Sequence, residues 1–280
     1  MTMRWLILLL CIAAAGPTSQ PAPATQPDYF AMSSDEFAAC EAAKQIINFD
    51  RPDQTLLSAG ILHETNRWRA REGRSTLSHH PKVDDAAMMH VRDMVAKNYL
   101  AHAEKGTKTP HPIDRVRAAG LAPILVAENI GTASGIQYKG GEPVFPLRQW
   151  RRGGLSYREN GPAIPPHTYR TFTEVVVKQW IDSPTHRENI MLRDAKYLGA
   201  ACLPAIAKGA TESEFHKFYT AQVLFTPSRF ANDEPRAKSN RDDDDSADRA
   251  RQPDAAPPEP PVPDPIGEDP KDHKQSGGGN

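Results

Sequence analysis

Residues 215–225 read FHKFYTAQVLF, and this segment decides the fold. Read as a strand, it carries apolar side chains on both alternating faces: Phe218 and Leu224 on one, and Tyr219, Ala221, Val223 and Phe225 on the other. A strand that is apolar on both faces belongs inside a sheet that is covered on both sides. The segment therefore predicts three layers, with helices on either side of a small sheet.

Strand and helix signals around this segment complete an α+β pattern. Residues 197–206 predict a second strand, which precedes the first across a short turn. Apolar residues recur at helical spacing in 57–68, 86–95 and 113–116, and again before Trp180. Pro81 and Pro184 suit the first positions of two helices, and Ser183 is the expected N-cap of the second.

The N-terminus has the three parts of a secretion signal. Arg4 supplies the positive charge, residues 5–15 are apolar but too short to span a membrane, and three alanines end the run. We expect cleavage after Ala15 and a secreted or periplasmic protein. A lipoprotein anchored through Cys11 is the minor alternative, because Leu10 stands where a small residue is wanted.

Composition divides the rest of the chain. Residues 16–32 predict a proline-rich linker, 33–55 an N-terminal helical extension packed outside the main domain, and 56–227 the folded domain. Within it, residues 132–171 lack periodicity and predict a long loop or insertion over a cleft. Residues 228–280 are acidic and proline-rich, which predicts a disordered tail, either a solvated spacer or a docking segment for a protein partner.

Charge and cysteine content exclude some classes of protein. The formal net charge is -1, so there is no electrostatic case for a nucleic-acid partner. No segment after the N-terminus is apolar enough to predict a transmembrane span. Two cysteines, Cys40 and Cys202, remain after cleavage, and one disulfide and two buried thiols are equally open.

Five short motifs stand in a recognisable order. They are YLAH at 99–102, AENI at 127–130, WIDSPTHRENI at 180–190, YLG at 197–199 and YTAQ at 219–222. Their order and spacing resemble the CAP superfamily of cysteine-rich secretory proteins, venom antigens and pathogenesis-related proteins, and most of all its bacterial secreted branch. The resemblance covers residues 56–227 and implies an α-β-α sandwich with a mainly antiparallel sheet.

The resemblance also implies a cleft with two histidines and an acid. Carried over residue by residue, these are His102, Glu128 and His186. Animal and plant members have a second acid where this chain has Ser183, and Asp182 stands beside it. We place Asp182 and Ser183 at the cleft, and Gln222 as a polar contact near it.

These residue types suit a metal site. Two neutral imidazoles, with Glu128 as a further candidate ligand, suit a divalent cation such as zinc and leave positions open. Without metal, His102, Glu128 and His186 would be a general acid/base set. Structural roles are also open: His102 at a helix end, Glu128 accepting backbone N–H groups, and His186 bonding within its turn.

The function expected from this is binding. We predict a secreted module that holds a small molecule, a lipid or a cell-envelope component in the cleft, together with a divalent cation. One alternative is a hydrolase that uses a metal-activated water in the same cleft. Another is an interaction protein that works through its tail. Likeness of fold does not decide between binding and catalysis.

Overall fold

The computed structural model describes residues 27–104, 106–147, 154–205 and 217–228. All of them belong to the first of two units into which the chain divides, Met1–Glu234 and Pro235–Asn280. The predicted signal peptide, residues 16–26 of the linker and all but the first residue of the tail lie outside the described residues. In the described part of the chain, no helix combines the length and apolarity that crossing a membrane requires.

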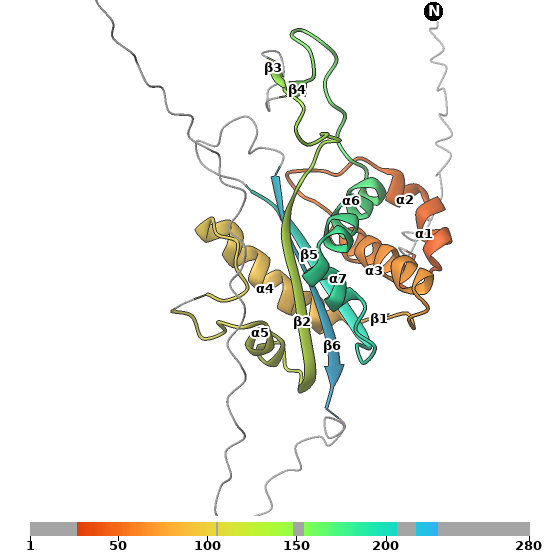
Figure 1. Ribbon diagram of the computed structural model, residues 1–280, viewed down its shortest axis with the longest axis vertical. Coiled ribbons are helices and arrows are strands. Elements are labelled where there is room, and N and C mark those ends of the chain that lie inside the picture. Colours follow the sequence, from red (N-terminus) through yellow and green to blue (C-terminus); the bar gives the residue numbers. More distant parts are fainter. Residues whose placement is uncertain (1–26, 105, 148–153, 206–216, 229–280) are drawn as a thin grey trace, which may run out of the picture. The chain divides into compact units, whose positions relative to one another are not determined.

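A four-stranded sheet forms the middle layer, in the order β1-β5-β6-β2. Its strands are β1 (Ser78–His79), β5 (Tyr197–Pro204), β6 (Lys217–Pro227) and β2 (Pro123–Ser134). β6 pairs antiparallel with both β5 and β2, and only the two-residue β1 pairs in parallel. The expected mainly antiparallel sheet is confirmed, with β2 as an edge strand (Figure 1).

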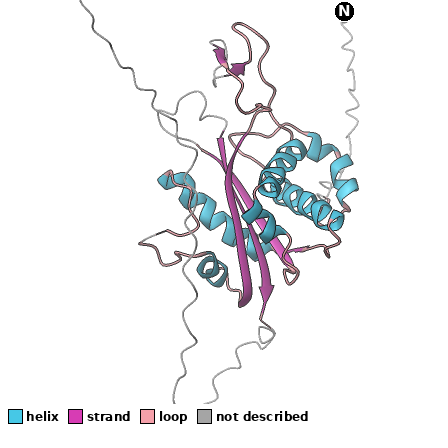
Figure 2. Ribbon diagram, in the orientation of Figure 1, coloured by secondary structure: helices cyan, strands magenta, loops and turns pink. Residues whose placement is uncertain are grey.

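Helices cover both faces of this sheet, as the sequence predicted (Figure 2). α3 (Gln54–Arg71), α6 (Tyr169–Asp182) and α7 (Pro184–Ile190) lie on one side, and α4 (Pro81–Lys97) and α5 (Pro112–Ala118) on the other. The apolar side chains of β6 divide between the two cores as their alternation predicts. Phe218 and Leu224 join the core under α3 and α6, whereas Tyr219, Ala221, Val223 and Phe225 join the core under α4.

The close packing of α4 on the sheet depends on Gly199. A Cβ at Gly199 would collide with the backbone of Val83 and Asp84, in the first turn of α4. α4 begins at Pro81, as predicted, and ends at Asn98, which adopts the left-handed conformation with φ 50°. Ser183 is the N-cap of α7, although its side chain makes no capping hydrogen bond.

The N-terminal extension corrects one expectation. It forms α1 (Ser34–Ala39) and α2 (Glu41–Lys44), and Ser33 and Glu36 make a capping box at the start of α1. The extension does not pack outside the domain, however. Phe37, Ala43 and Ile47 are buried in the core shared with α3 and α6. Two helices this short have no interior of their own, so their apolar side chains insert into the nearest core.

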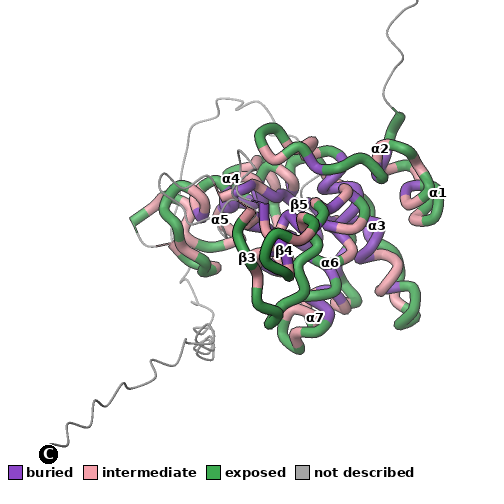
Figure 3. Tube along the Cα trace, turned by 90° about the horizontal axis from the view of Figure 1, so that it is seen from above, coloured by how far each residue is buried: buried purple, intermediate pink, exposed green. Residues whose placement is uncertain are grey.

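The segment predicted as a long loop contains some regular structure. β2 extends into it as far as Ser134, and α6 begins at Tyr169. Between them lies a short antiparallel pair, β3 (Phe145–Leu147) and β4 (Gly154–Ser156), which projects beyond the main sheet (Figure 1). A bridge between Ile136 and Pro166 closes the base of this segment. Buried positions gather instead where α3, α4 and α6 meet the strands (Figure 3).

The two cysteines are both free thiols, so the disulfide alternative is wrong for this structure. Cys202 is fully buried in β5, and burial raises the pKa of its thiol. Cys40 lies half-buried between α1 and α2. The shared core and hydrogen bonds such as that from the hydroxyl of Ser34 to the carbonyl of His63, at 3.1 Å, therefore hold the N-terminal helices to the domain.

Candidate functional site: a histidine pair beside a buried carboxylate

Glu128 is the centre of the site. It lies in the middle of β2, in register with Val223 of β6, and its side chain is 1% exposed. A carboxylate withdrawn from water this completely needs charged or hydrogen-bonded partners. The elements around β2 supply them from α4, from α5 and from the loop that joins these two helices.

Three side chains converge on this carboxylate. Nδ1 of His102 lies 2.9 Å from Oε1, and Nδ1 of His90, from α4, lies 2.9 Å from Oε2. Nη2 of Arg115, from α5, lies 3.1 Å from Oε1 and 2.9 Å from Oε2. Each oxygen therefore accepts hydrogen bonds from two groups. The structural alternative for Glu128, a carboxylate held by backbone N–H groups, is replaced by one held by side chains.

These contacts determine the charge of Glu128. Burial alone would raise its pKa, but the hydrogen bonds from His102 and His90, together with the charges of His90 and Arg115, outweigh that effect. The net result lowers the pKa of Glu128 to about 2. Glu128 is thus a buried, permanent anion at any pH near neutrality.

The same residues fix the loop that carries His102. His90 donates from Nε2 to the carbonyl of Ala101, 3.0 Å away, and Arg115 donates from Nη2 to the carbonyl of His102, also 3.0 Å away. Arg115 reaches the carbonyls of Thr109 and Pro110 through Nη1. The loop between α4 and α5 is therefore tied down on both sides of His102.

His102 itself faces outward. Its side chain is 39% exposed, although Nδ1 is bonded to the buried carboxylate. Donation from Nδ1 to a carboxylate selects the tautomer in which Nε2 carries a lone pair. The exposed ring nitrogen of His102 is consequently an acceptor, suited to a metal ion, a proton or a donor group on a ligand.

His186 lies at the same site. The amide of Asn129, the neighbour of Glu128 on β2, donates to the carbonyl of His186 at 3.1 Å. The pKa of His186 is lowered, first by burial and second by its electrostatic interaction with His102. The imidazole of His186 is therefore neutral at neutral pH. His102 and Glu128 are thus in direct contact, and the backbone of His186 is bonded to the residue next to Glu128, although the three come from separate motifs.

Gln222 contacts the neighbour of Glu128 from the interior of the domain. It is fully buried and accepts from Asn129 at 3.0 Å while donating to Oγ1 of Thr65 at 2.7 Å. Asn189 of α7 donates to Oδ1 of Asn129 and to the carbonyl of Glu128. This amide network joins α3, β6, β2 and α7, and so holds the helix that carries His186 against the strand that carries Glu128.

Asp182 and Ser183 have other roles. The exposed carboxylate of Asp182 pairs with Lys178 one turn earlier on α6, at 2.7 Å. Ser183 is half-buried at the N-cap of α7, and its hydroxyl lies 3.5 Å from that of Thr185. Within the described residues, no hydrogen bond joins either side chain to His102 or His186.

The residues fit a cation only in part. In the described ranges, no group of three or more His, Cys, Asp or Glu side chains is arranged to hold a metal ion. Glu128 is engaged by His90, His102 and Arg115, so its role is to orient His102. The two imidazoles of His102 and His186 are what the chain offers a metal, fewer than the three protein ligands of typical catalytic zinc sites.

His90 and Arg115 are the residues that sequence reasoning missed. His90 falls in the apolar stripe of α4, where its period marked it as core. It is 1% exposed, and a buried histidine always needs polar partners, which is the signal that was available. Arg115 is 2% exposed on a helix of seven residues, and its sequence context gives no comparable signal.

Comparison with known proteins gives one family. A sequence model of the cysteine-rich secretory protein family, CAP, matches residues 62–220, more than half of the chain. No curated protein sequence matches.

Two of the similar solved structures are bacterial. One is an extracellular protein containing an SCP domain from Bacillus anthracis, with 19% identity over 61% of this chain and 41% of that chain, at a TM-score of 0.39. The other is an outer surface protein from Borrelia burgdorferi, with 16% identity over 59% of this chain and 88% of that chain, at a TM-score of 0.38. TM-scores this low carry no argument, so the assignment rests on the family match together with the sandwich seen here: the chain belongs to the cysteine-rich secretory protein (CAP) family.

Proposed function

We propose that this protein is an exported binding module whose ligand contacts the exposed edges of His102 and His186. The ligand is a small molecule, a lipid or a component of the cell envelope. The observation that carries the proposal is the 2.9 Å contact between Nδ1 of His102 and Oε1 of Glu128. It turns an exposed imidazole into a rigid acceptor of known orientation.

The physical case for binding is preorganisation. A charge-assisted hydrogen bond holds the imidazole of His102, and an amide hydrogen bond holds the backbone of His186, so His102 loses little side-chain entropy when a ligand binds. The carbonyl of His186 is bonded to Asn129, next to Glu128 on β2, and the lowered pKa of His186 keeps that ring neutral. An oriented acceptor on His102 and a neutral imidazole on His186 suit a cation or a ligand rich in donors.

A divalent cation fits this proposal as a shared component. His102, through Nε2, and His186 would hold it, and Glu128 would orient His102 from behind. When bound, such a cation supplies positive charge for carboxylate, phosphate or carbonyl oxygens of a ligand. With only two protein ligands, we expect weak, exchangeable binding rather than a structural metal.

Calorimetric titration of zinc tests this proposal. Wild type should bind one ion, and His102→Ala and His186→Ala should each abolish most of the heat. His111→Asn is the matched control: His111 is exposed at the N-cap of α5, and asparagine keeps a good cap while removing an imidazole. Equal binding by all four proteins would eliminate the histidine pair as the site.

One observation favours a second candidate, a hydrolase. A neutral His186 beside His102 is a suitable general base at neutral pH. The assay is turnover of peptide and ester substrates by wild type and His186→Ala. Hydrolysis that His186→Ala abolishes would support the hydrolase, and equal background rates would exclude it.

A further inference from the structure

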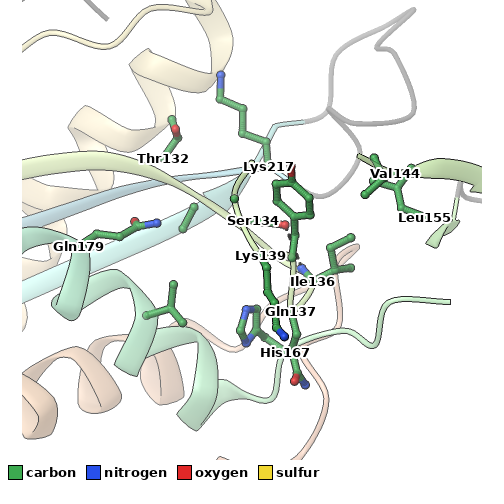
Figure 4. Close-up of a pocket in the computed structure, with 14 residues that line it drawn as sticks. Thr132, Ser134, Ile136, Gln137, Lys139, Val144, Leu155, His167, Gln179 and Lys217 are labelled. Atoms are coloured by element: carbon green, nitrogen blue, oxygen red, sulfur yellow. Dashed lines mark hydrogen bonds between the residues drawn. The ribbon is translucent and has the colours of Figure 1, made fainter. Parts of the chain in front are cut away.

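A cavity outside the histidine site lies where β2 passes into the insertion. It has a volume of about 670 Å³, within the range of small-molecule sites. Its walls come from the end of β2, the loop at 135–144, β4, the exposed face of α6 and the start of β6 (Figure 4). The histidine site and the cavity share β2, but none of His102, Glu128 and His186 lines the cavity. Thr132, which does, is four residues from Glu128, or roughly 13 Å along the strand.

The walls of this cavity are largely apolar. Ala133, Ile136, Val144, Leu155 and Val175 line it. Val175 is 36% exposed although it stands on the helix that packs against the core, and the neighbouring Tyr138 is 38% exposed. Apolar side chains that remain in contact with water around a hollow are typical of a surface that a ligand covers.

The loop that forms one wall is held in place without a ligand. Gln137 donates from its backbone to Pro165 at 2.8 Å and from its side chain to Pro166 at 3.1 Å. The hydroxyl of Tyr157 accepts from the backbone N–H of Lys139 at 2.7 Å, and the rings of Tyr157 and Tyr138 stack with centroids 6.3 Å apart. The cavity is therefore part of the fold of the insertion.

The charge at this cavity has one sign. Lys139 and Lys217 line it, and among the described residues no aspartate or glutamate does. Lys217 extends away from the other side chains in Figure 4, and its Nζ lies 4.8 Å from the ring centroid of Tyr219. Lys139 lies among the lining side chains, and no ion pair joins it to a carboxylate in the described part of the chain. His167 adds no charge at neutral pH, because burial lowers its pKa.

We propose that this cavity binds an anionic amphiphile with a single alkyl chain, the chain against Ile136, Leu155 and Val175 and the carboxylate or phosphate group on Lys139. A neutral amphiphile would leave the Lys139 ammonium without a charged partner in the cavity. A small anion without an alkyl chain would leave the apolar walls in contact with water. This cavity and the histidine pair are separate binding sites, and the proposal for the cavity does not depend on the proposal for the histidine pair.

Displacement of a fluorescent fatty acid measures this binding, below the critical micelle concentration of each competitor. Dodecanoate and dodecyl phosphate should both compete, and dodecanol and dodecyltrimethylammonium should be at least about tenfold weaker, because they lack the charge-assisted contact. Between octanoate and dodecanoate, affinity should rise by about fourfold per methylene.

Four variants localise the site and separate it from the histidine pair. Lys139→Glu should reverse the order of dodecanoate and dodecyltrimethylammonium, whereas Lys108→Glu, an exposed lysine outside the cavity, should leave it unchanged. Val175→Glu, at a position exposed enough to preserve folding, should weaken every amphiphile. His102→Ala should bind dodecanoate like wild type, which separates this proposal from the histidine site. Equal affinities for acid, alcohol and ammonium, or identical effects of the two lysine reversals, would overturn it.

Discussion

Nδ1 of His102 and Oε1 of Glu128 lie 2.9 Å apart, and this contact joins an imidazole that is 39% exposed to a carboxylate that is 1% exposed. The pair links the stability of the domain to the chemistry of its surface. Glu128 is an anion because of its buried partners, and His102 presents Nε2 because of Glu128. Changes to the buried partners should therefore affect both folding and binding.

Acid should destabilise the domain through Glu128. Its pKa is about 2 in the folded state against 4.5 for an unperturbed glutamate, so the unfolded state binds more protons as the pH falls. Its contribution is present above pH 4.5 and is lost as the pH falls toward 2, on the order of 3 kcal/mol in all. Urea unfolding of wild type and Glu128→Gln between pH 7 and pH 2.5 measures this. The free energy of unfolding should fall less steeply with decreasing pH in Glu128→Gln than in wild type. Parallel pH dependences of the two proteins would contradict the prediction.

Arg115→Met should cost about 3–5 kcal/mol of unfolding free energy, because it leaves Glu128 buried with less compensation. Arg117→Met is the control on the same helix. Arg117 is 60% exposed and pairs with Asp114 at 3.9 Å, so its loss should cost less than about 1 kcal/mol. Chemical denaturation measures both values. Similar losses for the two variants would show that Arg115 does not stabilise the buried carboxylate.

Gly199→Ala should destabilise the domain by roughly 1–3 kcal/mol, because the added methyl group collides with the backbone of α4. Gly140→Ala is the comparison, since a Cβ there meets no atom within 4 Å. Thermal melting reports both. If Gly199→Ala and Gly140→Ala had the same melting temperature, the inference that α4 packs closely on β5 at Gly199 would be wrong.

Both cysteines should titrate as free thiols in denatured, unreduced protein. In the native protein the half-buried Cys40 should react first, because Cys202 is fully buried and burial raises its thiol pKa. Mass spectrometry after alkylation counts the labels. A protein without alkyl label, whose mass is two hydrogens below that of the form with two free thiols, would show that Cys40 and Cys202 form a disulfide.

Most of the fold could be predicted because β6 is so informative. Its apolar residues on both faces required two covering layers, and the two cores contain those residues as expected. β2 was not predicted as a strand. Its buried positions include Glu128 and Asn129, so the apolar pattern that marks a strand is absent where the site is built. A functional strand is thus harder to recognise from periodicity than a structural one.

The site could be predicted only from its motifs. His102, Glu128 and His186 each stood in a motif, but pairwise contacts depend on tertiary structure. His90 looked like a core position and Arg115 like an ordinary residue of a short helix, yet both bind Glu128. Gln222 also stood in a motif, and its place on a strand buried on both faces makes it an interior partner of Asn129.

The central claim is that Glu128 fixes His102 as the Nδ1–H tautomer and so presents Nε2 beside His186 for binding. Long-range nitrogen–proton NMR of labelled protein, with and without zinc, reads the state of each ring nitrogen directly. We expect His102 protonated on Nδ1 at pH 7.5, with zinc shifting its Nε2 and one ring nitrogen of His186 together. A proton on Nε2 of His102, or zinc shifts at only one of the two rings, would contradict the account.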